Sequence, residues 1–213
     1  MNRLHARWTV VLLGTLAFHA FLGAAEIKTL TLRPESTLSL NGDSTLHPFS
    51  SRATQLNAQS ELDSHLATAS ESETFKAVLQ AGGLKHFKFT VPVTGLKSKE
   101  SSLDKNMYKA LKADQYPDIT FTLSHYDVTV STGTAPAWHL KALGMLQIAG
   151  KEQPITLEAG ISEEASVLRV QGEYRLQMTS YGIKPPTMMM GAIKVKDNIT
   201  IQFNLELTTA SLK

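Results

Sequence analysis

Apolar and polar residues alternate along much of the chain with a period of two. In the clearest run, residues 199–207, every odd-numbered position is apolar and every even-numbered one is polar. Because successive side chains of a strand point to opposite faces, this pattern predicts a strand with one buried face. Similar runs cover 87–93, 119–123, 138–148 and 155–161, and further strand candidates are 37–40, 54–62, 74–79 and 167–178.

Turn-forming residues separate these runs. We predict turns at Asn41-Gly42-Asp43, with the next strand beginning at Ser44, and at Gly82-Gly83, Ser131-Thr132-Gly133, Gly150-Lys151-Glu152, Glu163-Glu164 and Asp197-Asn198. Short strands at this spacing, most of them with a single apolar face, are typical of an all-β, antiparallel sandwich or barrel.

One segment, about 101–112, has a helical period instead. Leu103, Met107 and Leu111 are spaced at i, i+4 and i+8, which predicts a short amphipathic helix. Ser101 or Ser102 is the expected N-cap, and Tyr116-Pro117 ends the segment before the next strand. A lone helix among strands either closes one end of the barrel or gates a cavity, and both interpretations stay open.

Residues 1–25 have the three parts of a secretory signal peptide. A basic stretch, 1–7, precedes the apolar stretch 8–22 and the small residues Gly23-Ala24-Ala25. The alternative is a membrane anchor, but the apolar stretch is shorter than the roughly 20 residues of a span and His19 interrupts it. We therefore expect cleavage near Ala25 and a single exported domain, 26–213, that is periplasmic or secreted.

Composition narrows the possible partners. The chain has 21 Lys and Arg, and the predicted leader contains two of them, so 19 remain against 19 Asp and Glu. A balanced charge argues against nucleic acid and against a strongly anionic membrane surface as partners. Since the chain has 0 Cys, neither a disulfide, a thiolate metal site nor a catalytic thiol is possible.

Candidate chemistry is sparse. The His residues at 47, 65, 86, 125 and 139 form no short metal-binding spacing, and no G-x-S-x-G nucleophile motif occurs. The segment 43–47 contains Asp, Ser and His, but its turn residues favour a structural role. We expect no catalytic site, no metal site and no cofactor.

The methionine run, Met188 to Met190, is open to three interpretations. Thioether sulfur is a soft ligand that suits Cu(I), and methionine also fills irregular apolar surfaces. Three consecutive side chains of an extended segment point in alternating directions, so they do not converge on one ion. We favour an apolar cavity opening over plain packing and over a metal site.

Five short motifs resemble those of a known family. They are 42–47 (GDSTLH), 116–121 (YPDITF), 144–157 (GMLQIAGKEQPITL), 180–183 (SYGI) and 195–201 (VKDNITI). In this order, with a helix between strand groups, they are similar to the YceI-like family of exported, lipocalin-like barrels that bind polyisoprenoid lipids. The resemblance spans about 36–207.

This resemblance implies an antiparallel barrel of about eight strands that binds an apolar ligand, such as a quinone or a polyprenyl carrier, and has no enzymatic activity. An eight-stranded barrel has room for side chains or one slender ligand. The predicted barrel lining is Phe89, Val91, Phe121, Leu123, Leu146, Ile148, Tyr174, Leu176, Ile201 and Phe203. The predicted cavity mouth is Met107, Met188, Met189 and Met190.

Two alternatives remain at this point. The first is an enzyme that acts on an isoprenoid lipid, for which His86, His125 and His139 are the residues to test. The second is a structural or metal-binding module that uses the methionine run and binds no lipid. The oligomeric state is not predicted.

Overall fold

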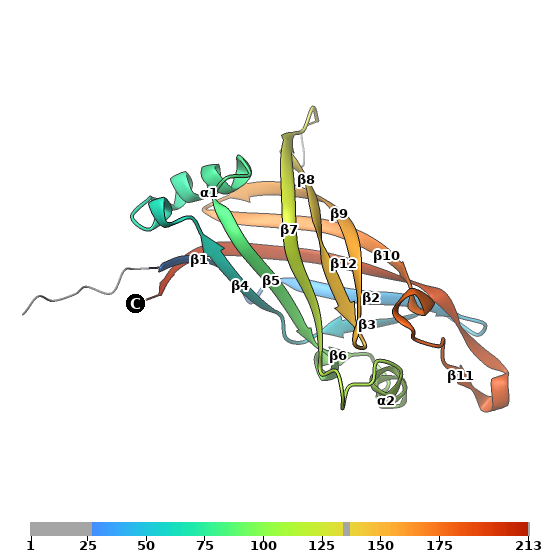
Figure 1. Cartoon of the computed structure of the whole chain (residues 1–213). Helices are drawn as coiled ribbons and strands as arrows, with labels where there is room; N and C mark the ends of the chain where they lie inside the picture. The colour runs from blue at the N-terminus through green and yellow to red at the C-terminus, as the bar shows by residue number, and fades with distance from the viewer. Residues whose placement is uncertain (1–26, 134–136, 213) are drawn as a thin grey trace, which may run out of the picture.

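The structure, a computed structural model, describes residues 27–133 and 137–212, so the predicted signal peptide lies outside the described residues. The described chain forms one antiparallel sheet of twelve strands and two α-helices (Figure 1). The strands are β1 (Ile27–Leu32), β2 (Thr37–Ser44), β3 (Phe49–Ala53), β4 (Asn57–Leu62), β5 (Leu84–Pro92), β6 (Leu96–Lys97), β7 (Asp118–Val130), β8 (Trp138–Ile148), β9 (Lys151–Glu164), β10 (Val167–Gln177), β11 (Thr187–Met188) and β12 (Ile193–Leu212). The helices are α1 (Glu71–Leu79) and α2 (Ser101–Ala110).

The sheet curls into a lipocalin-like barrel, as predicted. Its strand order is β4-β5-β7-β8-β9-β10-β12-β2-β3-β6. Strand β6, at one end of this order, follows β5 in sequence through the short helix Val93–Gly95 and pairs with β3, which brings the two ends of the sheet together. The strand count exceeds the predicted eight because β6 and β11 are two-residue strands and because two separate strands, β1 and β2, pair with β12.

The barrel is also closed by a contact between β1 and β4, the strand at the opposite end of the sheet order from β6. Within the described residues no strand ladder joins them; instead, Ser60 on β4 bonds to the backbone of Leu30 on β1. The Leu30 N–H donates to Ser60 Oγ at 2.6 Å, and Ser60 Oγ donates to the Leu30 carbonyl at 3.1 Å. One hydroxyl thus satisfies both backbone groups of a residue whose side chain is buried.

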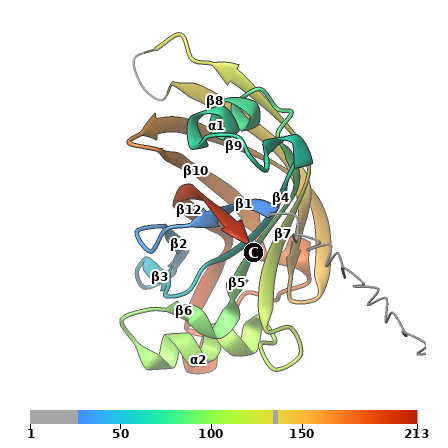
Figure 2. The ribbon, with the colours of Figure 1, turned by 90° about the vertical axis from the view of Figure 1, so that its left-hand side faces the viewer.

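The helices α1 and α2 lie at opposite ends of the barrel (Figure 2). Helix α1 includes the segment 74–79, for which the predicted strand is wrong. Ser70 and Glu73 form a capping box at its start, and the helix buries Phe75 and Val78, which are spaced at i and i+3.

Helix α2 begins at Ser101, as predicted, and ends at Ala110, two residues before the predicted end. Its N-cap is Glu100, so the prediction of a serine cap at Ser101 or Ser102 is wrong. Glu100 makes no side-chain cap bond, and Asp104 in the first turn instead accepts the Ser98 N–H at 2.7 Å. A carboxylate in the first turn is also favoured by the helix dipole.

Three predicted turns are parts of strands. Glu163-Glu164 are the last two residues of β9, and the turn itself is at Ala165-Ser166. Asn41-Gly42-Asp43 lies within β2. This strand ends at Ser44, where the sequence pattern predicted that the next strand begins. A Cβ atom on Gly42 would lie 2.3 Å from Cζ of Phe49, so glycine here allows the aromatic ring to approach the backbone. Asp197-Asn198 lies within β12, at a register irregularity between Val195 and Ile199.

No helix among the described residues is long and apolar enough to cross a membrane. The buried side chains form two clusters. One, around Phe89, Phe121 and Leu146, lies toward α2, and the other, around Phe75 and Leu168, lies under α1.

Candidate functional site: an apolar cavity in the barrel

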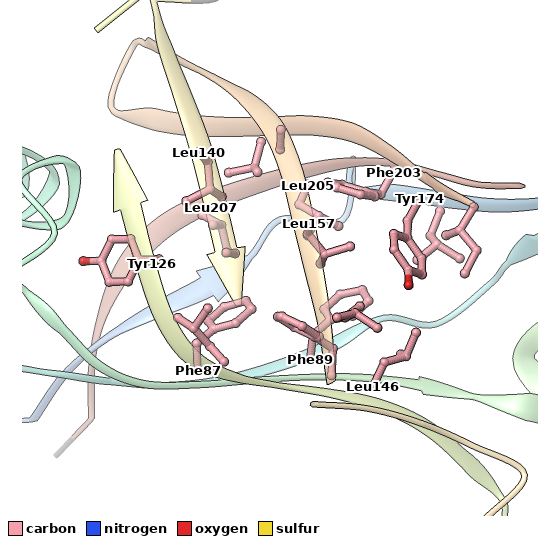
Figure 3. A pocket seen from close by; sticks show the side chains of 18 of the residues that line it. Phe87, Phe89, Tyr126, Leu140, Leu146, Leu157, Tyr174, Phe203, Leu205 and Leu207 are labelled. Atoms are coloured by element: carbon pink, nitrogen blue, oxygen red, sulfur yellow. The ribbon is translucent and has the colours of Figure 1, made fainter. Parts of the chain in front are cut away.

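A cavity of about 200 Å³ lies inside the barrel. Side chains from α1, β1 and most of the larger strands line it. Figure 3 shows lining side chains of β5, β7, β8, β9, β10 and β12, among them Phe89, Tyr126 and Phe203. All 28 lining residues are apolar apart from the hydroxyls of two tyrosines. They are Leu30, Leu38, Leu40, Val78, Leu84, Phe87, Phe89, Val91, Leu96, Ile119, Phe121, Leu123, Tyr126, Val128, Leu140, Ala142, Leu146, Ile155, Leu157, Ala159, Ile161, Leu168, Val170, Tyr174, Ile201, Phe203, Leu205 and Leu207.

The period-two alternation explains most of this lining. On β12, for example, Ile201, Phe203, Leu205 and Leu207 all face the cavity, and the intervening polar residues do not line it. A strand therefore supplies one lining residue in every two positions, as the sequence pattern predicts.

A register irregularity on β7 changes the phase of the alternation. Leu123 pairs with Gly144 and His125 pairs with Leu143, which leaves Ser124 as an extra residue. Before it, odd-numbered residues such as Phe121 line the cavity; after it, the even-numbered Tyr126 and Val128 do so. The bulge thus keeps both halves of this long strand in the cavity wall.

Eight of the ten predicted lining residues lie in the wall of this cavity. These eight are Phe89, Val91, Phe121, Leu123, Leu146, Tyr174, Ile201 and Phe203. The other two, Ile148 and Leu176, belong to or pack against the same core cluster but do not line the cavity. Whether any of them contacts a ligand stays a prediction.

Of the predicted mouth residues, neither Met107 nor Met190 lines the cavity. Met107 on α2 packs against the core cluster without lining the cavity. Met190 has a relative exposure of 108% and points to solvent. The side chains of Met188 and Met189 lie outside the described part of the structure.

Sequence reasoning missed three kinds of lining residue. Val78 lies on α1, which the sequence pattern misassigned as a strand, and Leu30 lies on β1, next to the predicted leader. Tyr126 and Val128 follow the β7 bulge. The capping-box pair Ser70 and Glu73 is the sequence signal that would have identified α1.

The two lining tyrosines are uncharged at neutral pH. Tyr126 donates its hydroxyl to the Val78 carbonyl at 3.0 Å, at the end of α1, and burial raises its pKa. Burial also raises the pKa of Tyr174 and the pKa of Tyr181. The lining therefore offers no charged partner to a ligand.

Helix α1 is fastened to strands that are distant in sequence. Glu71 accepts the hydroxyls of Thr208 at 3.0 Å and Thr209 at 3.1 Å, both on β12. At the other end of α1, the Tyr126 hydroxyl of β7 holds the Val78 carbonyl. These bonds fix both ends of the helix over one end of the cavity.

Helix α2 is fastened by residues close in sequence. Tyr108 donates its hydroxyl to the Leu96 carbonyl at 2.6 Å, and Lys97 lies 5.2 Å from the centre of the Tyr108 ring. No residue of α2 lines the cavity. The hydrogen bond and the ring contact of Tyr108 thus attach α2 to β6, the strand that precedes it.

The histidines proposed for an enzyme are not at the cavity. His86, His125 and His139 are exposed and none of them lines it. In the ranges 27–133 and 137–212, no group of three or more His, Asp or Glu side chains is arranged to hold a metal ion.

A curled antiparallel sheet around an apolar, uncharged cavity defines a lipocalin-like barrel. The chain belongs to the YceI-like family, because the model of the YceI-like domain matches residues 31–207. Comparison with curated protein sequences gave no match.

Solved structures share this fold at low sequence identity. BcnA of Burkholderia cenocepacia is 17% identical, with a TM-score of 0.60, and the match covers 84% of this chain and 99% of that one. A polyisoprenoid-binding domain from Saccharophagus degradans, implicated in plant cell wall breakdown, is 10% identical, with a TM-score of 0.61 and coverage of 85% and 99%. A mutant Campylobacter jejuni YceI protein with a monobromobimane guest is 19% identical, with a TM-score of 0.51 and coverage of 76% and 84%.

Proposed function

We propose that the protein is an exported carrier that holds a polyisoprenoid-type lipid, such as a quinone or a polyprenyl carrier, in the barrel cavity, and that it is not an enzyme. The observation that carries this proposal is the lining of 28 residues without a charged group. Transfer of a hydrocarbon chain from water is favourable by about 0.8 kcal/mol per buried CH₂, so a long tail gains affinity without a polar partner.

Two further points support a lipid of this type. The Saccharophagus degradans domain with the same fold is described as polyisoprenoid-binding. The sequence motifs resemble a family of exported lipid binders, and residues 1–25 resemble a signal peptide, which is consistent with a carrier in an aqueous compartment outside the cytoplasm.

The ligand must widen the cavity. Its volume of about 200 Å³ is below the roughly 300–1,000 Å³ of most ligand pockets. Since α1 is tied at both ends to distant strands and α2 is tied to neighbouring residues, the α2 end is the part of the barrel that opens for a chain to enter.

The first experiment identifies the ligand directly. The full chain is expressed with its own leader and purified without denaturant; its N-terminus and its organic extract are then identified by mass spectrometry. We expect an N-terminus at Glu26 and a stoichiometric isoprenoid. A correctly folded protein with an empty extract, and with no uptake of added polyprenol or ubiquinone, contradicts the proposal.

A pair of neighbouring variants assigns the ligand to the cavity. Ala142 lines the cavity, whereas Leu143, the next residue on β8, is 38% exposed. Ala142→Trp fills the cavity and is expected to abolish lipid copurification, and Leu143→Trp is the matched control outside the barrel. If folded Ala142→Trp retains its lipid, the lipid lies elsewhere.

A further inference from the structure

Two loops project together from the ends of β2 and β12. One is the β2–β3 loop, 45–48, and the other is the β11–β12 hairpin, which extends away from the barrel in Figure 1. Thr45 joins them: its N–H donates to the Lys194 carbonyl at 2.9 Å, and its hydroxyl accepts the Lys194 N–H at 3.1 Å. The two loops therefore form one structural unit.

This unit exposes two large apolar side chains. Leu46 has a relative exposure of 65% and Met190 one of 108%. Met190 has a φ of 58°, in the left-handed region that residues other than glycine rarely adopt. Gly191 follows with a φ of 95°. We call Leu46 and Met190 the apolar tip.

Lysines occur in the segments on both sides of Met190. Lys184, Lys194 and Lys196 are exposed on the two arms of the hairpin, and no Asp or Glu occurs from 184 to 196. Lys196 pairs with Asp43 on β2. Within the described residues, Lys184 and Lys194 have no carboxylate partner, so two positive charges remain uncompensated beside the tip.

We propose that the apolar tip is a docking site for an anionic phospholipid bilayer. Leu46 and Met190 would enter the boundary between headgroups and acyl chains, and Lys184 and Lys194 would lie among the lipid phosphates. Exposed apolar side chains flanked by lysines are the features that bind protein segments reversibly to such surfaces.

The balanced charge of the chain does not oppose this local contact. Electrostatic attraction to a membrane is screened over about 10 Å at moderate salt. The lysines at the docked tip therefore contribute to the electrostatic attraction, whereas acidic residues on remote parts of the barrel add little repulsion. The inference does not depend on what the cavity holds, because binding to the bilayer needs no isoprenoid.

Flotation with lipid vesicles tests the proposal. The exported protein is mixed with vesicles of phosphatidylglycerol and phosphatidylcholine, or of phosphatidylcholine alone, without added isoprenoid. We expect binding to the anionic vesicles, with an affinity that falls as salt rises. Equal binding to both kinds of vesicle, or binding to neither, overturns the proposal.

Variants separate the apolar and the charged contributions. The double variant Leu46→Glu/Met190→Glu is expected to lower the partition coefficient at least about tenfold, because it replaces two inserted apolar groups by charges. Val130→Glu is the matched control, since Val130 is also exposed, at 77%, but lies at the end of β7. Lys184→Gln and Lys194→Gln are each expected to weaken binding about fivefold.

A direct reporter tests insertion without disabling the tip. In Met190→Trp, we expect the new tryptophan to be quenched by brominated acyl chains, unlike one at Val130→Trp. Unchanged vesicle binding of Leu46→Glu/Met190→Glu overturns the proposal. The proposal is also overturned if the protein does not bind vesicles and the apolar tip instead packs against a second copy of the chain or binds Cu(I).

Discussion

The ring of Phe121 occupies the space that a side chain at Gly144 would need. The two residues lie on the paired strands β7 and β8, and an ideal Cβ on Gly144 would be 2.6 Å from Cε2 and Cζ of the ring. The same atom would be 2.4 Å from the Thr122 carbonyl oxygen. Glycine at this position therefore lets the Phe121 ring lie along β8 and line the cavity.

Gly144→Ala should destabilise the barrel. The new Cβ meets a backbone oxygen as well as the ring, and a backbone oxygen cannot rotate away as the end of a side chain can. Overpacking of this kind costs about 1–3 kcal/mol. Urea unfolding measures the loss, and Gly82→Ala is the control, since a Cβ at Gly82 meets nothing within 4 Å. Equal stability of Gly144→Ala and wild type would contradict this packing.

Ser60→Ala should weaken the closure between β1 and β4. Its hydroxyl bonds to the N–H and the carbonyl of Leu30, so its removal leaves two backbone groups without these partners. A buried group left unsatisfied costs about 1–3 kcal/mol. We expect faster hydrogen exchange in β1 and a lower free energy of unfolding. Ser50→Ala, at an exposed position of β3, should change neither. Exchange in β1 as slow as in the wild type would show that the closure does not depend on Ser60.

Tyr126→Phe should loosen the end of α1. The variant keeps the ring in the cavity wall but loses the hydroxyl that donates to the Val78 carbonyl at 3.0 Å. A typical hydrogen bond contributes about 1 kcal/mol, and the Ala81 N–H still donates to the same carbonyl. We therefore expect a loss of about 1 kcal/mol in chemical unfolding. Tyr116→Phe, at a ring that is 39% exposed, should unfold like the wild type.

The Asp104 carboxylate should make stability depend on pH. Its hydrogen bonds to Ser98, together with the charge of Lys97, lower its pKa. A group with a lower pKa in the folded state stabilises that state above its unfolded pKa of about 4, and this contribution is lost as pH falls through the folded value.

Asp104→Asn isolates that contribution. We expect the variant to be less stable than the wild type at pH 7 and the difference to shrink as pH falls below about 4. Urea unfolding at a series of pH values measures it, with Asp114→Asn, at an exposed position, as the control. A difference that stays constant down to pH 2 would assign the effect to the amide itself rather than to the charge.

Hydrophobic alternation predicted an antiparallel sandwich or barrel, because each strand carries its own period, and the resemblance to the YceI-like family favoured the barrel. For β12, the odd positions from Ile201 to Leu207 line the cavity as the pattern indicates. The pattern failed where local signals compete. Residues 74–79 contain Thr, Phe and Val, which favour strands, but the capping box at Ser70 and the burial of Phe75 against the barrel stabilise a helix.

Other features depend on contacts between distant segments. The Asn-Gly-Asp run of β2 looks like a turn, and only the approach of Phe49 to Gly42 shows why glycine is needed there. The phase change at Ser124 depends on pairing with β8. The cavity is lined by side chains of ten elements that together leave the centre of the barrel partly empty. Its presence depends on their combined packing and not on any one residue type.

The pairing of β1 with the C-terminal part of β12 has a consequence for the order of folding. Ile27 is opposite Leu212, so this ladder joins the two ends of the described chain, whereas β7, β8, β9 and β10 pair with their immediate neighbours. Local pairings form fast and those that close long loops form late. This difference predicts that the concave sheet assembles before the β1–β12 ladder joins the two ends. For the proposed carrier, such an order would allow the folding chain to enclose its lipid without the lipid passing either helix.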